Sequence, residues 1–287
     1  MRRVFCALLA LGVVSPAAAA DFDLLRGPEP IVPVAPAPLP VGPATFTRWS
    51  GFYVGGQFGV SNASGDFSTA TQSLVAYTLR DTTLESEVTP SQWPVLGSVS
   101  QSALSGGGFI GFNTQWQDLV LGMEANYNYA PVSLHAPNSP IGRSTSDSTG
   151  SAYALSFGGT GSLVAQDFAT LRLRAGWIVG NFLPYGFVGF AMGVATTSVT
   201  VSGVGTQYTS GVVGTCTASQ PCGSFGINNS FNANSQVLYG FTVGAGVDYA
   251  ITSNIFVRAE FEWDQFNPPP GFLLTVASGR IGGGFKF

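Results

Sequence analysis

The sequence predicts an all-β fold, an eight-stranded antiparallel up-and-down transmembrane β-barrel with short periplasmic turns and long extracellular loops. Three observations predict it: a secretory leader, a composition poor in charge, and segments in which apolar and polar residues alternate. Charged residues make up 9% of the chain and Gly numbers 38, and the mean hydropathy is positive. Soluble domains usually carry about 25% charged residues, so this composition favours a chain that meets lipid.

The first twenty residues are typical of a signal peptide. Arg2 and Arg3 precede an apolar stretch over 4–14, and small residues follow as far as Ala20. The apolar stretch is too short for a spanning helix, and small residues before Ala20 predict cleavage after it. The mature chain then has nine bases against 15 acids, a net charge of −6. This acidic balance disfavours nucleic acid as a partner.

The chain divides into a signal peptide over 1–20, a Pro-rich periplasmic tether over 21–48 and an outer-membrane β-barrel domain over 49–287. Within the tether, 28–43 alternates proline with small apolar residues. This composition favours an extended polyproline-like segment that cannot form a core. No linker interrupts the chain after residue 50, which predicts one domain.

Eight segments of 12 to 15 residues alternate with period two, as a strand with two different faces does. Long gaps near 62–101, 130–165 and 197–235, and a shorter one at 266–274, alternate with short gaps at 113–118, 179–181 and 252–254. Bacterial barrels show this pattern, and an even number of strands places both chain ends in the periplasm. The segments lie near 50–61, 102–113, 118–129, 166–177, 182–196, 236–250, 254–265 and 275–287.

Each charged strand keeps its charges on one face, which predicts a charge network in the lumen. Interleaved acids and bases satisfy each other, and the interior of an eight-stranded barrel is just wide enough for side chains. A structural plug is therefore favoured over an open pore. If the last two strands pair across 266–274, Glu260 falls opposite Arg280. The predicted network is Glu124, Arg172, Arg174, Asp248, Arg258, Glu260, Glu262, Asp264, Arg280 and Lys286.

Aromatic residues near the strand ends predict two girdles at the membrane interfaces. The segment 182–196 carries no charge, so its inward face is not assigned. A single spanning helix over 175–195 is rejected because Asn181 and Pro184 lie mid-span and 179–181 suits a turn. The aromatic set is Trp49, Phe52, Tyr53, Tyr127, Tyr129, Trp177, Tyr185, Tyr249, Trp263 and Phe266.

No motif points to catalysis. His135 is the single histidine, in a Pro-flanked gap without a neighbouring acid. The run 106–111 fits a phosphate-binding glycine motif, but it lies inside a strand and leads to another strand, where that motif needs a helix. Cys216 and Cys222 are expected to form a local disulfide outside the cytoplasm, since a structural zinc site needs four ligands. We expect no enzyme, no cofactor and no metal.

Four short motifs, in order along the chain, carry a family resemblance: 49–55 (WSGFYVG), 111–113 (GFN), 244–250 (GAGVDYA) and 281–287 (IGGGFKF). They resemble the alphaproteobacterial outer-membrane immunogenic proteins, relatives of the opacity-type and OmpA-like small barrels of the porin family. The Pro-rich tether also matches. The resemblance implies a surface-exposed, antigenic barrel without catalytic residues. It also implies that Phe285 and Phe287 are the signal for the barrel-assembly machinery.

The function expected is therefore a structural and surface-exposed role in the bacterial outer membrane, among its lipids and lipopolysaccharide. Two alternatives stay open. The barrel could be a narrow porin-like diffusion channel whose inner charges set selectivity. The long loops could instead bind a ligand or host factor, because binding residues are often carried on loops.

Overall fold

The computed structural model describes residues 48–268 and 273–287. All described residues belong to one compact unit, 45–287. The expected signal peptide, its cleavage after Ala20 and residues 21–47 of the expected tether lie outside the described residues.

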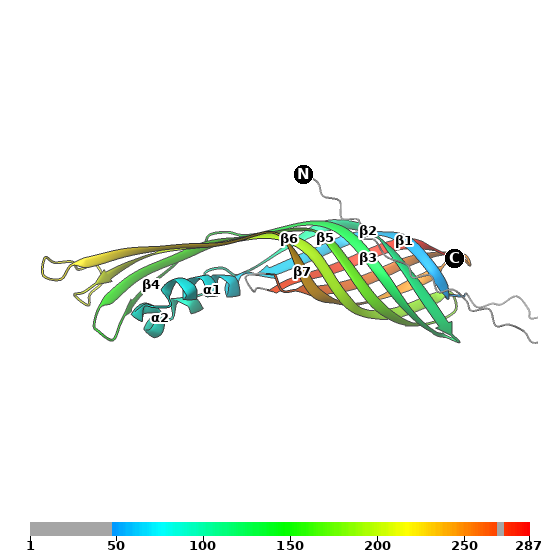
Figure 1. Ribbon diagram of the computed structural model, residues 1–287, viewed down its shortest axis with the longest axis horizontal. Helices are drawn as coiled ribbons and strands as arrows, with labels where there is room; N and C mark the ends of the chain where they lie inside the picture. The colour runs from blue at the N-terminus through cyan, green and yellow to red at the C-terminus, as the bar shows by residue number, and fades with distance from the viewer. Residues whose placement is uncertain (1–47, 269–272) are drawn as a thin grey trace, which may run out of the picture. The chain divides into compact units, whose positions relative to one another are not determined.

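Eight strands close into a ring, which confirms the predicted antiparallel up-and-down barrel (Figure 1). Each strand of the ring pairs antiparallel with its neighbours, and the ring closes through β1–β9 and β3–β5 pairing. The ring strands are β1 (Gly51–Asp66), β2 (Ser98–Trp116), β3 (Leu119–Ala136), β5 (Ala152–Trp177), β6 (Phe182–Tyr208), β7 (Cys222–Ala250), β8 (Ile255–Phe266) and β9 (Leu273–Lys286).

The outer surface of the ring is apolar. Large side chains such as Phe58, Leu173, Phe190 and Phe261 are more than half exposed there, while the residues between them on each strand point inward. Soluble monomers rarely expose contiguous apolar patches beyond a few hundred Å². Hydrocarbon satisfies such a surface, and a closed ring leaves no strand edge unpaired inside a bilayer.

Three links, at 117–118, 178–181 and 251–254, join strands by tight turns at one end of the ring, here called the short-turn end. Residues 48 and 286 lie here too, since the Lys286 amide donates to the Asn254 carbonyl at 2.7 Å and its ammonium donates to the Arg48 carbonyl at 3.0 Å. The sequence-predicted short gaps are thus found together at one end.

The other end carries an ordered extension in place of two expected loops. β5, β6 and β7 have 26, 27 and 29 residues, whereas about 9–11 span a bilayer. At about 3.3 Å per residue, β7 runs for about 95 Å. We call the extension sheet β4 (Ile141–Ser146) with 152–160, 200–208 and 222–230, which pair in that order (Figure 1). The expectation of loops over most of 130–165 and 197–235 was therefore wrong.

The first long gap, 62–101, contains α1 (Ser68–Leu79), α2 (Thr83–Val88) and the 3₁₀ turn η1 (Pro90–Gln92). The Thr82 hydroxyl caps α2 by accepting a hydrogen bond from the Glu85 amide at 3.3 Å. Neither helix of the described residues is long and apolar enough to cross a membrane.

A hydrophobic core joins these helices to the extension sheet. Val75 and Leu79 of α1 pack in one cluster with Leu155 and Phe157 of β5. Trp93 meets Phe157 edge to face, with ring centroids 5.6 Å apart. The extension therefore has a hydrophobic cluster of its own, and Leu74 of α1 packs against both this cluster and the one in the adjoining end of the ring.

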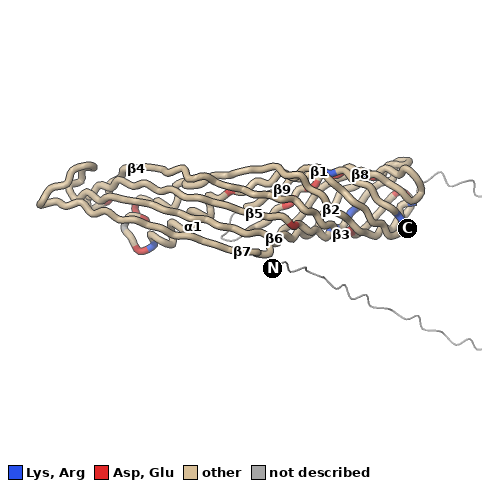
Figure 2. Tube along the Cα trace, turned by 90° about the horizontal axis from the view of Figure 1, so that it is seen from above, with Lys and Arg blue, Asp and Glu red and all other residues tan. Residues whose placement is uncertain are grey.

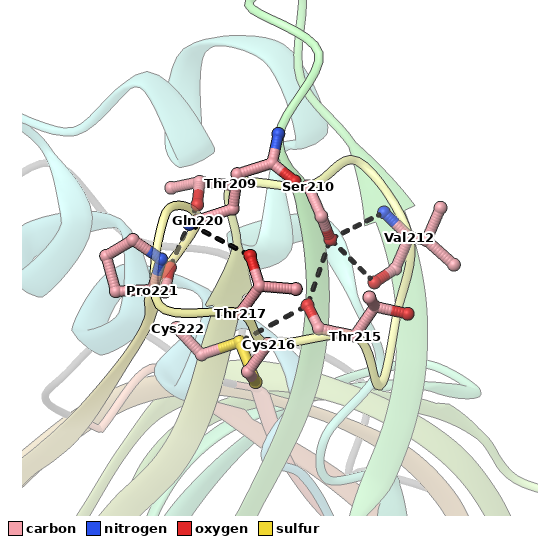
Figure 3. The surroundings of a disulfide bond; sticks show 9 residues. All are labelled: Thr209, Ser210, Val212, Thr215, Cys216, Thr217, Gln220, Pro221 and Cys222. Carbon is pink, nitrogen blue, oxygen red and sulfur yellow. Dashed lines mark hydrogen bonds between the residues drawn. A yellow bond between two sulfur atoms is a disulfide. The ribbon is translucent and has the colours of Figure 1, made fainter.

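The β6–β7 connection ends in a covalently closed tip (Figure 3). Cys216 and Cys222, expected to pair, form a disulfide with Cα atoms 5.5 Å apart. The Thr209 hydroxyl donates to the Pro221 carbonyl at 2.9 Å, and the Ser210 hydroxyl donates to the Thr215 carbonyl at 3.0 Å. These bonds tie 209–222 into a compact turn.

Candidate functional site

The lumen of the ring is filled in three layers. An aromatic and aliphatic layer that includes Trp49, Tyr53 and Phe256 occupies the short-turn end. A second apolar layer, with Phe266 and with Phe67 from the link into α1, occupies the other end. Between them lies a layer of charged side chains. Figure 2 shows the blue and red residues gathered in the ring, while the strands of the extension are mostly tan.

Arg172 of β5 stands at the centre of the charged layer. Its guanidinium reaches three carboxylates: Glu124 at 2.5 Å, Glu260 at 2.6 Å and Glu262 at 2.5 Å. Glu124 lies directly opposite Arg172 on the neighbouring strand β3, whereas Glu260 and Glu262 lie on β8, which is separated from β5 by β6 and β7. One side chain thus links strands that are not neighbours in the sheet.

Arg174 and Arg258 share two acids nearer the short-turn end, Glu124 again and Asp248. Arg174 pairs with Glu124 at 3.0 Å and with Asp248 at 2.6 Å. Arg258 pairs with the same two carboxylates at 2.9 and 2.8 Å. Every pair here is at least 95% buried, so neither water nor salt screens it as at a surface.

Arg280 of β9 completes the cluster by pairing with Glu262 at 2.5 Å and Glu260 at 3.4 Å. The predicted register is confirmed, because Glu260 lies directly opposite Arg280 between β8 and β9. We call the eight residues so joined the lumen network: Glu124, Arg172, Arg174, Asp248, Arg258, Glu260, Glu262 and Arg280.

Aromatic rings line the lumen network. Arg172 lies 4.0 Å from the centroid of Phe187, and Arg174 lies 3.8 Å from that of Tyr185. The Tyr53 hydroxyl donates to Glu124 at 2.6 Å, and the Tyr185 hydroxyl donates to Glu260 at 2.7 Å. Buried charges are tolerated when paired and hydrogen-bonded, and these contacts complete that requirement.

Four members of the predicted girdles are in the lumen instead. Trp49, Tyr53, Tyr185 and Phe266 are at most 5% exposed. The last three fall on the inward faces of their strands, and Trp49 precedes β1 and packs in the lumen with Phe256. Lying near a strand end does not decide whether a side chain points to lipid or to the lumen. That depends on the position of the residue in the two-residue alternation of the strand. The rest of the set lies on the outer surface, with Trp263 half-buried: Phe52, Tyr127, Tyr129, Trp177, Tyr249 and Trp263.

The inward face of β6 is now assigned. Leu183, Tyr185 and Phe187 point into the lumen, a result that the uncharged sequence did not reveal. Gly189 on the same face has a specific role, since a Cβ there would lie 2.6 Å from the Cα of Arg172. The one available signal was the contrast between small inward residues and large outward ones from 188 to 195.

Two residues of the predicted network lie outside it. Lys286 donates to the Arg48 carbonyl at 3.0 Å and sits 4.1 Å from the Trp49 ring centroid, at the short-turn end. Asp264 is buried, yet among the described residues it makes no ion pair. Lys286 ends β9 at the short-turn end, so its strand carries it beyond the charged layer. The alternation of apolar and polar residues predicted which face of the strand Lys286 occupies but not its depth in the lumen.

The remaining candidates are dispersed. His135 is exposed at the far end of β3, and 106–111 lies within β2. Phe285 and Phe287 are 44% and 74% exposed at the end of β9. No group of three metal-binding side chains occurs within 48–268 and 273–287.

A family model described as "Outer membrane protein beta-barrel domain" matches residues 5–267. This chain belongs to that family. Its curated relatives include the 25 kDa outer-membrane immunogenic proteins of Brucella ovis and Brucella canis. Each is 23% identical, over 253 and 263 residues, covering 88% of this chain and 85% of the relative. The expected resemblance is confirmed, and this barrel is a protein of the bacterial outer membrane.

Solved structures similar to this outer-membrane barrel include those of two bacterial proteins. Neisserial surface protein A is 14% identical, with a TM-score of 0.38, covering 83% of this chain and 98% of that one. The attachment invasion locus protein of Yersinia pestis is 11% identical, with a TM-score of 0.32, covering 83% and 99%.

Proposed function

We propose that the protein is a closed, non-catalytic surface barrel that displays its extension outside the cell for interaction with other molecules. One observation carries this proposal: β5, β6 and β7 run unbroken from the barrel wall into the extension sheet. A core that joins this sheet to α1 and α2 keeps the extension ordered. The barrel then acts as a fixed base, and binding function belongs to the part held away from the membrane.

The orientation follows from the two unlike ends of the ring. Outer-membrane barrels place short turns in the periplasm and long connections outside. The short-turn end, with Trp49 and Phe287, would then be periplasmic, and the extension would be extracellular among lipopolysaccharide. Phe285 and Phe287 would lie where the barrel-assembly machinery meets a new chain.

The antigenic role is proposed on the names of the Brucella relatives, which are immunogenic outer-membrane proteins. An ordered, exposed extension suits recognition by antibodies because its conformation is fixed before binding. The channel alternative is disfavoured, since three layers of side chains fill the lumen.

Binding of a ligand or host factor by the extension remains the second candidate. The extension sheet has two shallow grooves lined mainly by small and uncharged polar residues, with Val204 in both and Arg143 contributing to one of them. Such a surface offers hydroxyl and amide groups for hydrogen bonds and does not select strongly between charged and uncharged ligands.

A pair of epitope tags tests the orientation. We expect a tag after Gly150, in the β4–β5 turn, to bind antibody on intact cells. A matched tag after Ser253, in a short turn, should bind only after the outer membrane is permeabilised. Both insertions fall in turns, so the barrel itself is unaltered. Labelling of the Ser253 tag on intact cells, with a silent Gly150 tag, would refute the proposed orientation.

A further inference from the structure

The charged layer of the lumen contains one acid more than it has bases. The acids are Glu124, Asp248, Glu260, Glu262 and Asp264, and each is at most 5% exposed. Among the described residues, four bases, all arginines, lie in this layer: Arg172, Arg174, Arg258 and Arg280. If all nine were ionised, the layer would carry one uncompensated negative charge.

Lys286 does not supply the missing charge. Asp264 lies opposite Val276 on β9, and ten residues of strand separate Val276 from Lys286. At about 3.3 Å per residue this is about 33 Å. The Lys286 ammonium is moreover held by the Arg48 carbonyl at the short-turn end.

The geometry locates the surplus acid at Asp264. Its Oδ1 atom has no hydrogen-bond partner among the described residues, and the residue is 3% exposed. Opposite it on β7 lies Thr242, which is wholly buried and whose hydroxyl also lacks a described partner. The next inward-facing residue of β8, two positions after Asp264, is Phe266, a member of the apolar layer that closes the lumen.

The charged groups that face Asp264 are already engaged. Glu262 lies two residues away on β8 and repels a second negative charge. Arg280 on β9 and Arg172 on β5 are the nearest bases, and both pair with Glu260 and Glu262. β7 presents Thr242 at this level and no charge.

Rearranging the pairs does not remove the surplus. The Nε atom of Arg280 has no described partner, so this side chain could turn towards Asp264. Doing so would take a partner from Glu262 and leave five acids facing four bases. An isolated ionised carboxylate is so costly to bury that such groups take up a proton instead.

We propose that Asp264 is a proton-binding site, holding one proton at neutral pH and donating a hydrogen bond as a carboxylic acid. The proton brings the charged layer to electrical balance. With its proton, Asp264 can donate a hydrogen bond to Thr242 or to Glu262. The apolar layer next to it, at the extension end of the lumen, is compatible with an uncharged carboxyl group. The proton is the cation that needs the fewest ligands, and the described residues offer no metal-binding group of three.

Infrared spectroscopy tests the proton directly. The purified barrel at pH 7 is expected to show the C=O stretching band of a buried, protonated carboxyl group, and the Asp264→Asn variant is expected to lack it. Raising the pH of the wild-type barrel should remove the same band. Absence of the band from wild type at pH 7 would overturn the proposal, and this measurement does not depend on the variant.

Heat stability gives an independent readout, with Glu262→Gln as the matched control on the same strand. Asp264→Asn keeps a neutral group of the same shape, so at pH 7 its unfolding temperature should equal or exceed that of wild type. The unfolded wild-type chain ionises Asp264 above about pH 4, which favours unfolding there. The difference between wild type and Asp264→Asn should therefore vanish as the pH falls towards about 4.

Glu262→Gln removes an acid that pairs with Arg172 and Arg280, so it should lower the unfolding temperature at pH 7. If Asp264→Asn lowers it equally, Asp264 is ionised in the folded barrel and the proposal is wrong.

Discussion

Replacing Arg172 by leucine is expected to cause the largest loss of stability of any single substitution in the lumen. The change removes the one guanidinium shared by Glu124, Glu260 and Glu262. Removing one partner of a buried ion pair costs about 3–5 kcal/mol, because a charge is left uncompensated. The measurement is the temperature at which the detergent-solubilised barrel changes from its folded to its unfolded mobility on a gel.

The matched control for this variant is Arg80→Leu. Arg80 also pairs with an acid, Asp81, but the two side chains are 55% and 86% exposed. Exposed pairs contribute about 0–1 kcal/mol, so this variant should unfold close to the wild-type temperature. Equal effects of the two substitutions would mean that the lumen network does not stabilise the barrel.

Replacing Leu173 by arginine is expected to produce the second large effect. Leu173 lies on the outer face of β5, 62% exposed, between the inward-facing Arg172 and Arg174. An arginine on the lipid face near the bilayer midplane costs about 2–4 kcal/mol. We expect a smaller folded fraction in lipid vesicles, measured by the heat-modifiable gel shift.

Val204→Arg serves as the control. It places the same arginine on an exposed strand position, but in water and not in lipid. Val204 lies on β6 within the extension sheet and is 65% exposed, so water surrounds an arginine placed there. We expect normal folding of this variant. If Val204→Arg reduced the folded fraction as much as Leu173→Arg does, the extension would have to lie in lipid. If neither substitution reduced the folded fraction, the ring would not lie in the membrane.

The ring and its two faces could be predicted because the strands that form it separate charge from apolar residues with period two. In β8, Glu260 and Glu262 alternate with Phe261, so the inward face follows from the sequence. The same alternation predicts the pairing of Glu260 with Arg280, which the structure has. A strand with lipid on one side and a charged lumen on the other has a strong alternation of apolar and polar residues in its sequence.

The extension could not be predicted because both of its faces meet less contrasting surroundings. Its strands carry serine, threonine, asparagine and glycine, which also predominate in loops, and one face meets water while the other meets short helices. Their inner face is covered by residues that are distant in sequence, as Trp93 covers Phe157. The depth of a side chain in the lumen could not be predicted for a similar reason. The alternation of residues gives the face on which Lys286 and Asp264 lie, but the register between neighbouring strands determines which residues they contact.

Conductance of the purified barrel in planar lipid bilayers tests the closed lumen most directly. With the lumen network and the two apolar layers in place, we expect no discrete current steps at any applied voltage the membrane withstands. The folded state of the same sample is checked by its heat-modifiable gel mobility. Reproducible unitary conductance from folded wild-type protein would contradict the closed barrel and establish a channel.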